Sequence, residues 1–218
     1  TLRNSSAASD VYKRQNITVS GDWNDGGSFT PSTNTVTFDG SSAQSITSGG
    51  SVFYSVTISN TSSAVSIADK FEFSSGTLTI NSSAVFALAG YEFDDNGRTI
   101  TNNGTFQMNG DETLTTGALS IPGNTKIVDG SGATLTTGLA GLVNVEFNST
   151  GQTFILGEAL SYVSGNLTIA SNTTLDVNSS NDYAIFLGGD WTNNGTFTPR
   201  AGTVTFSGSD AQAMSGTT

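Results

Sequence analysis

The chain has 218 residues, with 26 Gly and only 3 Pro, and charged residues make up 11% of it, about half of the usual share in globular proteins. It contains no Cys and no His, which excludes a disulfide scaffold and Ser-His-Asp catalysis and removes the commonest zinc ligands. A net charge of −11 disfavours nucleic acid, and no apolar run is long enough for a transmembrane helix, so we expect no nucleic-acid partner and no direct membrane insertion.

Residues 1–15 (TLRNSSAASDVYKRQ) differ in composition from the rest. They hold Arg3, Lys13 and Arg14, three of the seven basic residues, and lack the apolar alternation that begins at Ile17. The stretch SAASDVYKRQ resembles translated sequencing-adaptor read-through at the edges of metagenomic reading frames. We therefore expect residues 1–15 to be an artefact or a disordered tail, with a natural linker or capping strand as the alternative. Without them, four basic and seventeen acidic residues remain, a net charge of −13.

Short runs that alternate apolar and polar residues recur from residue 16 onward, as strands do when one face is buried. They include 36–38, 56–58, 78–80, 145–147, 167–169 and 204–206. Strand centres recur evenly, at positions 36, 57, 79 and 100 and again at 146 and 168, and each step holds two or three short strands between Gly, Asn-Gly or Ser-Ser corners. No amphipathic helix is present. This pattern predicts an all-β fold, a right-handed parallel β-helix (β-solenoid) with about 21–22 residues per coil and about nine coils. Residues 16–218 would form one solenoid, with Leu78, Ile80, Leu167 and Ile169 pointing inward.

Longer repeats lie on top of this short period. Gly21-Asp22-Trp23 returns as Gly189-Asp190-Trp191, and the same offset of 168 relates the FTP, TVTF and GS-AQ segments that follow each copy. A second match, SGTLTI at 75–80 with SGNLTI at 164–169, has an offset of 89, and NNGTF recurs at an offset of 91. An immunoglobulin-like sandwich, with domains of roughly 100 residues, is the structural alternative. The even spacing of the strands and the absence of a linker between units favour the solenoid.

The segments GDWTNNGTFTP, GTVTFSGSDAQ and FYSVTISN resemble the GxWTNNGTFTPGTGTVTFNGSGAQTI repeats of large exported bacterial proteins, which look like adhesin, haemagglutinin or autotransporter-passenger β-helices. The resemblance covers nearly all of residues 16–218. It implies an extracellular or cell-surface location associated with the outer membrane, and a structural or adhesive role. Extracellular glycans, a host or neighbouring-cell surface and other domains of the same chain are the implied partners. The second copy stops within a repeat at Thr218, so we expect a longer parent chain.

An enzyme is the alternative function, because parallel β-helices include pectin lyases and glycoside hydrolases. Glycoside hydrolysis needs two carboxylates facing one substrate. The densest acidic pairs, Asp94-Asp95 and Asp111-Glu112, lie beside turn residues and are predicted to shape turns. We therefore predict no catalytic residue in this chain; a carbohydrate-active β-helix (polysaccharide lyase or glycoside hydrolase) would keep its catalytic coils outside it.

Three aromatic residues, Trp23, Trp191 and Tyr91, are candidate stacking platforms for sugars, although the repeated position of the two tryptophans favours packing between coils. No cofactor or metal site is predicted. Calcium would be the alternative ion, but Asp22 and Asp190 stand alone and the G-G-x-G-x-D calcium repeat does not occur. Pairs of the type Thr-x-Thr are also typical of ice-binding faces; we expect them not to recur on every coil and to serve as ordinary strand residues.

Overall fold

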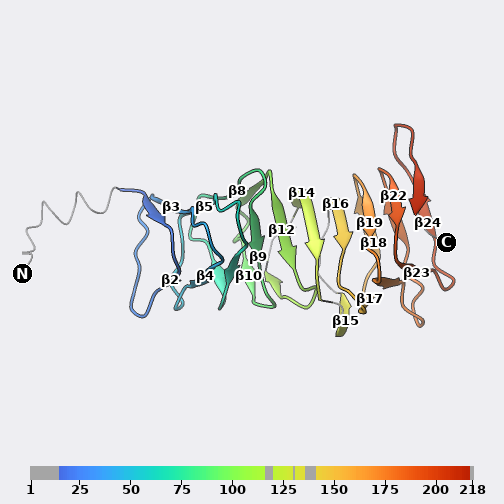
Figure 1. Cartoon of the computed structure of the whole chain (residues 1–218), viewed down its shortest axis with the longest axis horizontal. Helices are drawn as coiled ribbons and strands as arrows, with labels where there is room; N and C mark the ends of the chain where they lie inside the picture. Colours follow the sequence, from blue (N-terminus) through green and yellow to red (C-terminus); the bar gives the residue numbers. More distant parts are fainter. Residues whose placement is uncertain (1–14, 116–119, 130, 136–140, 217–218) are drawn as a thin grey trace, which may run out of the picture.

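The computed structural model describes residues 15–115, 120–129, 131–135 and 141–216, and within these ranges the chain is all-β without a helix. The strand pairings are parallel, and the chain winds through about nine turns that stack along one axis (Figure 1). The predicted β-solenoid is therefore confirmed. The sandwich alternative is wrong, because it requires antiparallel sheets. We predicted that residues 1–15 are an artefact or a disordered tail. Except for Gln15, these residues lie outside the part of the chain that the structure describes.

Each turn has three sides, and the first face begins as a five-stranded sheet. Its strands, in order of pairing, are β1 (Ile17–Val19), β3 (Thr35–Phe38), β5 (Ser55–Ile58), β8 (Thr77–Ile80) and β11 (Thr99–Asn102). Two long strands, β14 (Ser120–Ile127) and β16 (Gly141–Phe147), then turn the corner into the second face, with a register shift between Ile121 and Asn124. The first face ends with β18 (Leu160–Val163), β21 (Ile185–Leu187) and β24 (Val204–Phe206).

The second face runs the whole length of the described solenoid. It begins with β2 (Trp23–Asn24), β4 (Gln44–Thr47), β6 (Val65–Ile67), β9 (Val85–Ala87) and β12 (Thr105–Met108). It continues through β14 and β16 to β19 (Leu167–Ile169), β22 (Trp191–Asn193) and β25 (Met214–Gly216). This face carries the candidate site described below.

The third face consists of two shorter sheets. One contains β7 (Phe71–Glu72), β10 (Phe93–Asp94) and β13 (Leu114–Thr115). The other contains β15 (Ser131–Leu135), β17 (Thr153–Leu156), β20 (Thr174–Asp176) and β23 (Thr196–Thr198). In the turns that precede β7, the third side is a loop. An isolated parallel bridge between Phe53 and Phe73 links this loop to the chain at the end of β7.

Turn length varies around the predicted period. Ile17 pairs with Val36, a sequence separation of 19, whereas Leu167 pairs with Trp191, a separation of 24. The repeat with an offset of 168 relates β3 to β24, two strands of the first face near opposite ends of the solenoid. The match with an offset of 89 is different, since it relates β8 on the first face to β19 on the second. That match therefore reflects the similarity of the three sides and is not a whole number of turns.

The core fills the interior between the three faces. Phe rings stack across turns: the centroids of Phe53 and Phe71 are 4.9 Å apart with planes at 17°, and those of Phe71 and Phe93 are 6.1 Å apart at 4°. Full burial of such side chains contributes about 1.5–3 kcal/mol each. The largest fully buried side chains include nine phenylalanines: Phe38, Phe53, Phe71, Phe73, Phe86, Phe93, Phe106, Phe147 and Phe154. The four residues predicted to point inward, Leu78, Ile80, Leu167 and Ile169, are all buried.

Candidate functional site

A groove of about 470 Å³ lies in the middle of the second face. Its lining comes from five consecutive strands, β9, β12, β14, β16 and β19, which are adjacent in the sheet order. The groove therefore runs along the solenoid axis over four spacings between strands, about 19 Å. The lining residues are Val85, Thr105, Gln107, Asn124, Thr125, Lys126, Asn144, Val145, Glu146, Asn166 and Thr168.

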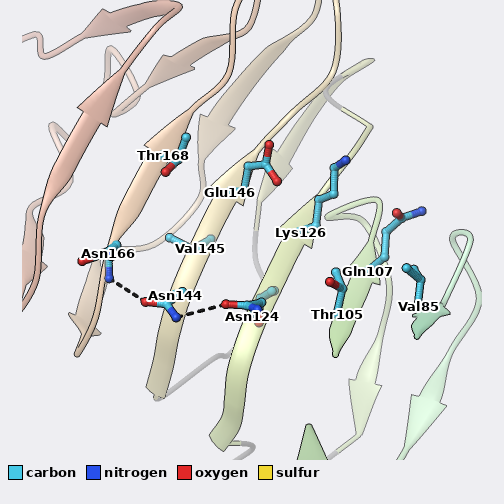
Figure 2. A pocket seen from close by; sticks show the side chains of 11 residues that line it. Val85, Thr105, Gln107, Asn124, Lys126, Asn144, Val145, Glu146, Asn166 and Thr168 are labelled. Atoms are coloured by element: carbon cyan, nitrogen blue, oxygen red, sulfur yellow. Dashed lines mark hydrogen bonds between the residues drawn. The ribbon is translucent and has the colours of Figure 1, made fainter. Parts of the chain in front are cut away.

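The strand period of two arranges nine of these side chains in two outward rows, whereas Thr125 and Val145 are buried between the rows. Phe86, Phe106 and Leu167 occupy the buried positions, so the residues on either side of each one face outward. One row therefore contains Val85, Thr105, Asn124, Asn144 and Asn166, and the other contains Gln107, Lys126, Glu146 and Thr168. The rows are separated by two residues along each strand, about 7 Å. Figure 2 shows both rows side by side.

Asparagine side chains bind successive turns together along the first row. The Nδ2 of Asn144 donates to Oδ1 of Asn124 over 3.0 Å, and the backbone N–H of Asn166 donates to Oδ1 of Asn144 over 2.9 Å (Figure 2). The ladder continues to the next turn, where the N–H of Asp190 donates to Oδ1 of Asn166 over 2.8 Å. Because these amides are held in place, this side of the groove is preorganised.

The second row carries one cation and one anion in neighbouring strands. Lys126 and Glu146 are register partners, but the carboxylate of Glu146 accepts a hydrogen bond of 2.7 Å from Nδ2 of Asn148. Figure 2 shows the two side chains next to each other on neighbouring strands. No described carboxylate lies within ion-pair distance of the Lys126 ammonium. In contrast, Lys70 approaches Glu92 to 3.1 Å.

No protein-family model matches the chain. Comparison with the curated proteins and with the solved structures finds no significant match either. The described residues include no helix long and apolar enough to cross a membrane. Among the same residues, no three acidic side chains come close enough together to hold a metal ion.

The three aromatic candidates lie outside the groove. Trp23 packs edge-on against Phe29 with ring centroids 4.9 Å apart, and Trp191 packs in the same way against Phe197 at 4.8 Å. Both of these contacts lie within one turn. Trp23 also packs against Phe53 of the following turn, with ring centroids 5.6 Å apart, and Trp191 is only 6% exposed and is paired in register with Leu167 and Met214 of the adjacent turns. Tyr91 is 43% exposed and lies in the turn before β10, on the third face.

Asp94, Asp95 and Glu112 of the acidic pairs accept hydrogen bonds in turns, as predicted. Asp94 accepts a hydrogen bond from the N–H of Asn96 over 2.8 Å, and Asp95 accepts one from the N–H of Gly97 over 3.0 Å. Burial raises the pKa of Asp95, against the opposing effect of the Gly97 hydrogen bond. The buried carboxylate of Glu112 accepts hydrogen bonds from backbone N–H groups, including that of Gly110 over 2.7 Å.

A polar clamp at the corner between the first and second faces was not apparent from the sequence. The buried Gln44 donates from Nε2 to the carbonyl oxygens of Val19 (2.9 Å) and Gly21 (2.6 Å) in the preceding turn, and its Oε1 accepts from the N–H of Gly40. A Cβ at Gly40 would lie 2.6 Å from the carbonyl oxygen of Ser20, so only glycine fits there. The repeated GS-AQ segment, noted above only as part of a repeat, is the sequence feature that could have indicated this clamp.

The same clamp recurs at the other end of the solenoid. Gln212 donates to the carbonyl oxygens of Leu187 and Gly189 over 3.1 and 2.6 Å. The weak calcium candidates Asp22 and Asp190 belong to these corners. Their carboxylates accept hydrogen bonds of 2.8 Å from the N–H groups of Ser45 and Ala213, each in the following turn.

Threonines form a column on the first face, although Thr-x-Thr pairs do not recur on every coil, as expected: β5 carries Ser55 and Thr57 at the equivalent positions. Outward positions of β1, β3, β5, β8 and β11 are all threonine and are paired in register: Thr18, Thr37, Thr57, Thr79 and Thr101. A parallel column two residues earlier includes Thr35, Ser55, Thr77 and Thr99. The sequence concealed this order because the turns differ in length.

Proposed function

We propose that the chain is a structural or adhesive segment of a large bacterial protein that is secreted or displayed at the cell surface. The observation that carries the proposal is the uninterrupted stack of about nine parallel turns around an apolar interior. At about 4.8 Å per turn, such a stack spans on the order of 45 Å. Each turn contacts only its neighbours, so the architecture suits a spacer that can be lengthened by whole turns.

The adhesive part of the proposal draws on the groove of the second face. Apart from Val85 and Val145, its lining is built from amides and hydroxyls with one lysine and one glutamate, chemistry that suits the hydroxyl groups of glycans. Among the described lining residues, Glu146 is the one carboxylate. A hydrolase of the usual type needs two facing carboxylates, so this lining favours contact without catalysis.

A glycan array probed with the purified chain tests the proposal. We expect retention of extracellular polysaccharides, and no release of products from pectin, alginate or xylan after prolonged incubation. Turnover of any of these polymers would favour the alternative, a carbohydrate-active β-helix. Absence of binding across the array would contradict an adhesive role and leave the spacer role.

A second candidate function, binding to ice, is favoured by the threonine columns of the first face. Their register places hydroxyl and methyl groups about 4.8 Å apart along the axis and about 7 Å apart across it. These spacings are close to those of oxygen atoms in surface planes of hexagonal ice. We expect the chain to slow ice recrystallisation and Thr57→Tyr to abolish that effect. Ser66→Tyr, on the second face, is the control; equal loss with both variants would contradict the assignment.

A further inference from the structure

We propose that the groove of the second face binds an extended anionic polysaccharide, with one acidic group of the glycan held by Lys126. The inference rests on the adhesive role proposed above and names its site and ligand class.

The shape of the groove specifies a linear ligand. It follows the axis for about 19 Å across five strands, and its two rows of side chains are about 7 Å apart. An extended glycan of about four sugar units matches this length, since one strand spacing of about 4.8 Å is close to the rise of one hexose. A compact small molecule would contact only a fraction of the lining.

The polar lining supplies hydrogen bonds to sugar hydroxyls along the whole groove. The Asn124, Asn144 and Asn166 amides are positioned by the ladder between turns, yet each amide group has more donors and acceptors than the ladder uses. Gln107 and Thr168 add an amide and a hydroxyl from the opposite row. Hydroxyl groups of a glycan can both donate and accept, so they complement such a mixed surface.

Lys126 determines the charge of the ligand. It is the one cation among the described lining residues, and no described carboxylate forms an ion pair with it. The neighbouring Glu146 is held by Asn148 instead. An ammonium group in an otherwise acidic protein is therefore available to a carboxylate or sulfate of the ligand.

A nucleic acid fits the groove less well than a uronate-bearing glycan. A nucleic-acid strand carries a phosphate at every nucleotide, and binding requires several cations along its path. The groove offers a single lysine among neutral groups and one glutamate, on a chain of net charge −11. One acidic group at Lys126, with hydroxyls elsewhere, is the arrangement that the lining supports.

Calorimetric titration with a tetramer of galacturonic acid and with its methyl ester tests the proposal on the full chain. The two probes share a backbone and differ in charge. We expect the acid to bind at least about tenfold more tightly than the ester, a difference of about 1.4 kcal/mol. Lys126→Gln should remove this preference, and Glu146→Gln should strengthen binding of the acid.

Arg98→Gln is the matched control, because it removes the same charge from an exposed residue outside the groove. It should leave both affinities unchanged, and circular dichroism should show the same fold in all variants. Equal binding of acid and ester, or equal effects of Lys126→Gln and Arg98→Gln, would overturn the anionic-ligand inference while the adhesive function stands. Failure to bind these probes or any glycan of the array would overturn both.

Discussion

Leu167→Asp tests the facing of the strands at a site where a matched control is the next residue. Leu167 is fully buried on the second face and is paired in register with Val145 and Trp191. Thr168 faces outward and is partly exposed. We expect Leu167→Asp to unfold the turns around β19 and β22, whereas Thr168→Asp should leave the fold intact.

The magnitude follows from the surroundings of Leu167. Loss of its apolar burial costs about 1.5–3 kcal/mol, and an unpaired buried carboxylate adds several kcal/mol. The total is comparable with the whole stability of a typical domain, about 5–15 kcal/mol. At Thr168 the new carboxylate lies opposite Glu146, so repulsion of at most about 1 kcal/mol is expected.

Trp191 provides the assay, because it is the register partner of Leu167. Trp23→Phe in all proteins leaves Trp191 as the single tryptophan, so its fluorescence reports on these turns during urea unfolding. With Leu167→Asp, the fluorescence should already be that of an exposed indole without urea. Thr168→Asn is the neutral counterpart of Thr168→Asp, so the difference between these two variants measures the effect of the charge alone. Equal shifts of the urea midpoint for Leu167→Asp and Thr168→Asp would show that the facing assignment is wrong.

Three further predictions concern contacts between and within turns. Gln44→Ala should lower the free energy of unfolding, measured by urea titration, by about 2 kcal/mol, because two carbonyls and one N–H lose their hydrogen-bond partner. The control Gln152→Ala, at an exposed position, should change it by less than about 0.5 kcal/mol. Burial raises the pKa of Asp95 in the folded state, so the charged carboxylate lowers the stability at neutral pH, and protonation removes this cost as pH falls through the folded pKa. Asp95→Asn should therefore raise the thermal midpoint at pH 7. This gain should vanish in acid. The Arg200 guanidinium lowers the pKa of Asp176, so this pair stabilises the fold above the unfolded pKa of Asp176 and stops doing so as pH falls through the folded pKa. Arg200→Gln should therefore lower the thermal midpoint at pH 7, and the melting curves of variant and wild type should converge at low pH.

The alternation of residues was sufficient to predict the strands, their facing and the class of fold. Burial of Leu78, Ile80, Leu167 and Ile169 follows from a period of two, which holds for any strand with one buried side. The acidic turns were also readable, because Asp94 and Asp95 precede Asn-Gly and their carboxylates reach backbone N–H groups two residues away. These are local features, set within a few residues.

Which side of the coil each strand occupies could not be read from the sequence. All three sides require the same alternation, so β8 and β19 share a motif although they lie on different faces. The threonine columns and the groove arise only after turns of unequal length bring distant strands into register. Gln107, Lys126 and Glu146 face outward, where no burial constrains their identity, so alternation alone gives no sign that they meet. Turn length decides this, because each strand takes its neighbours from the turns before and after it, and a shift of one residue would reverse the facing of every side chain in it.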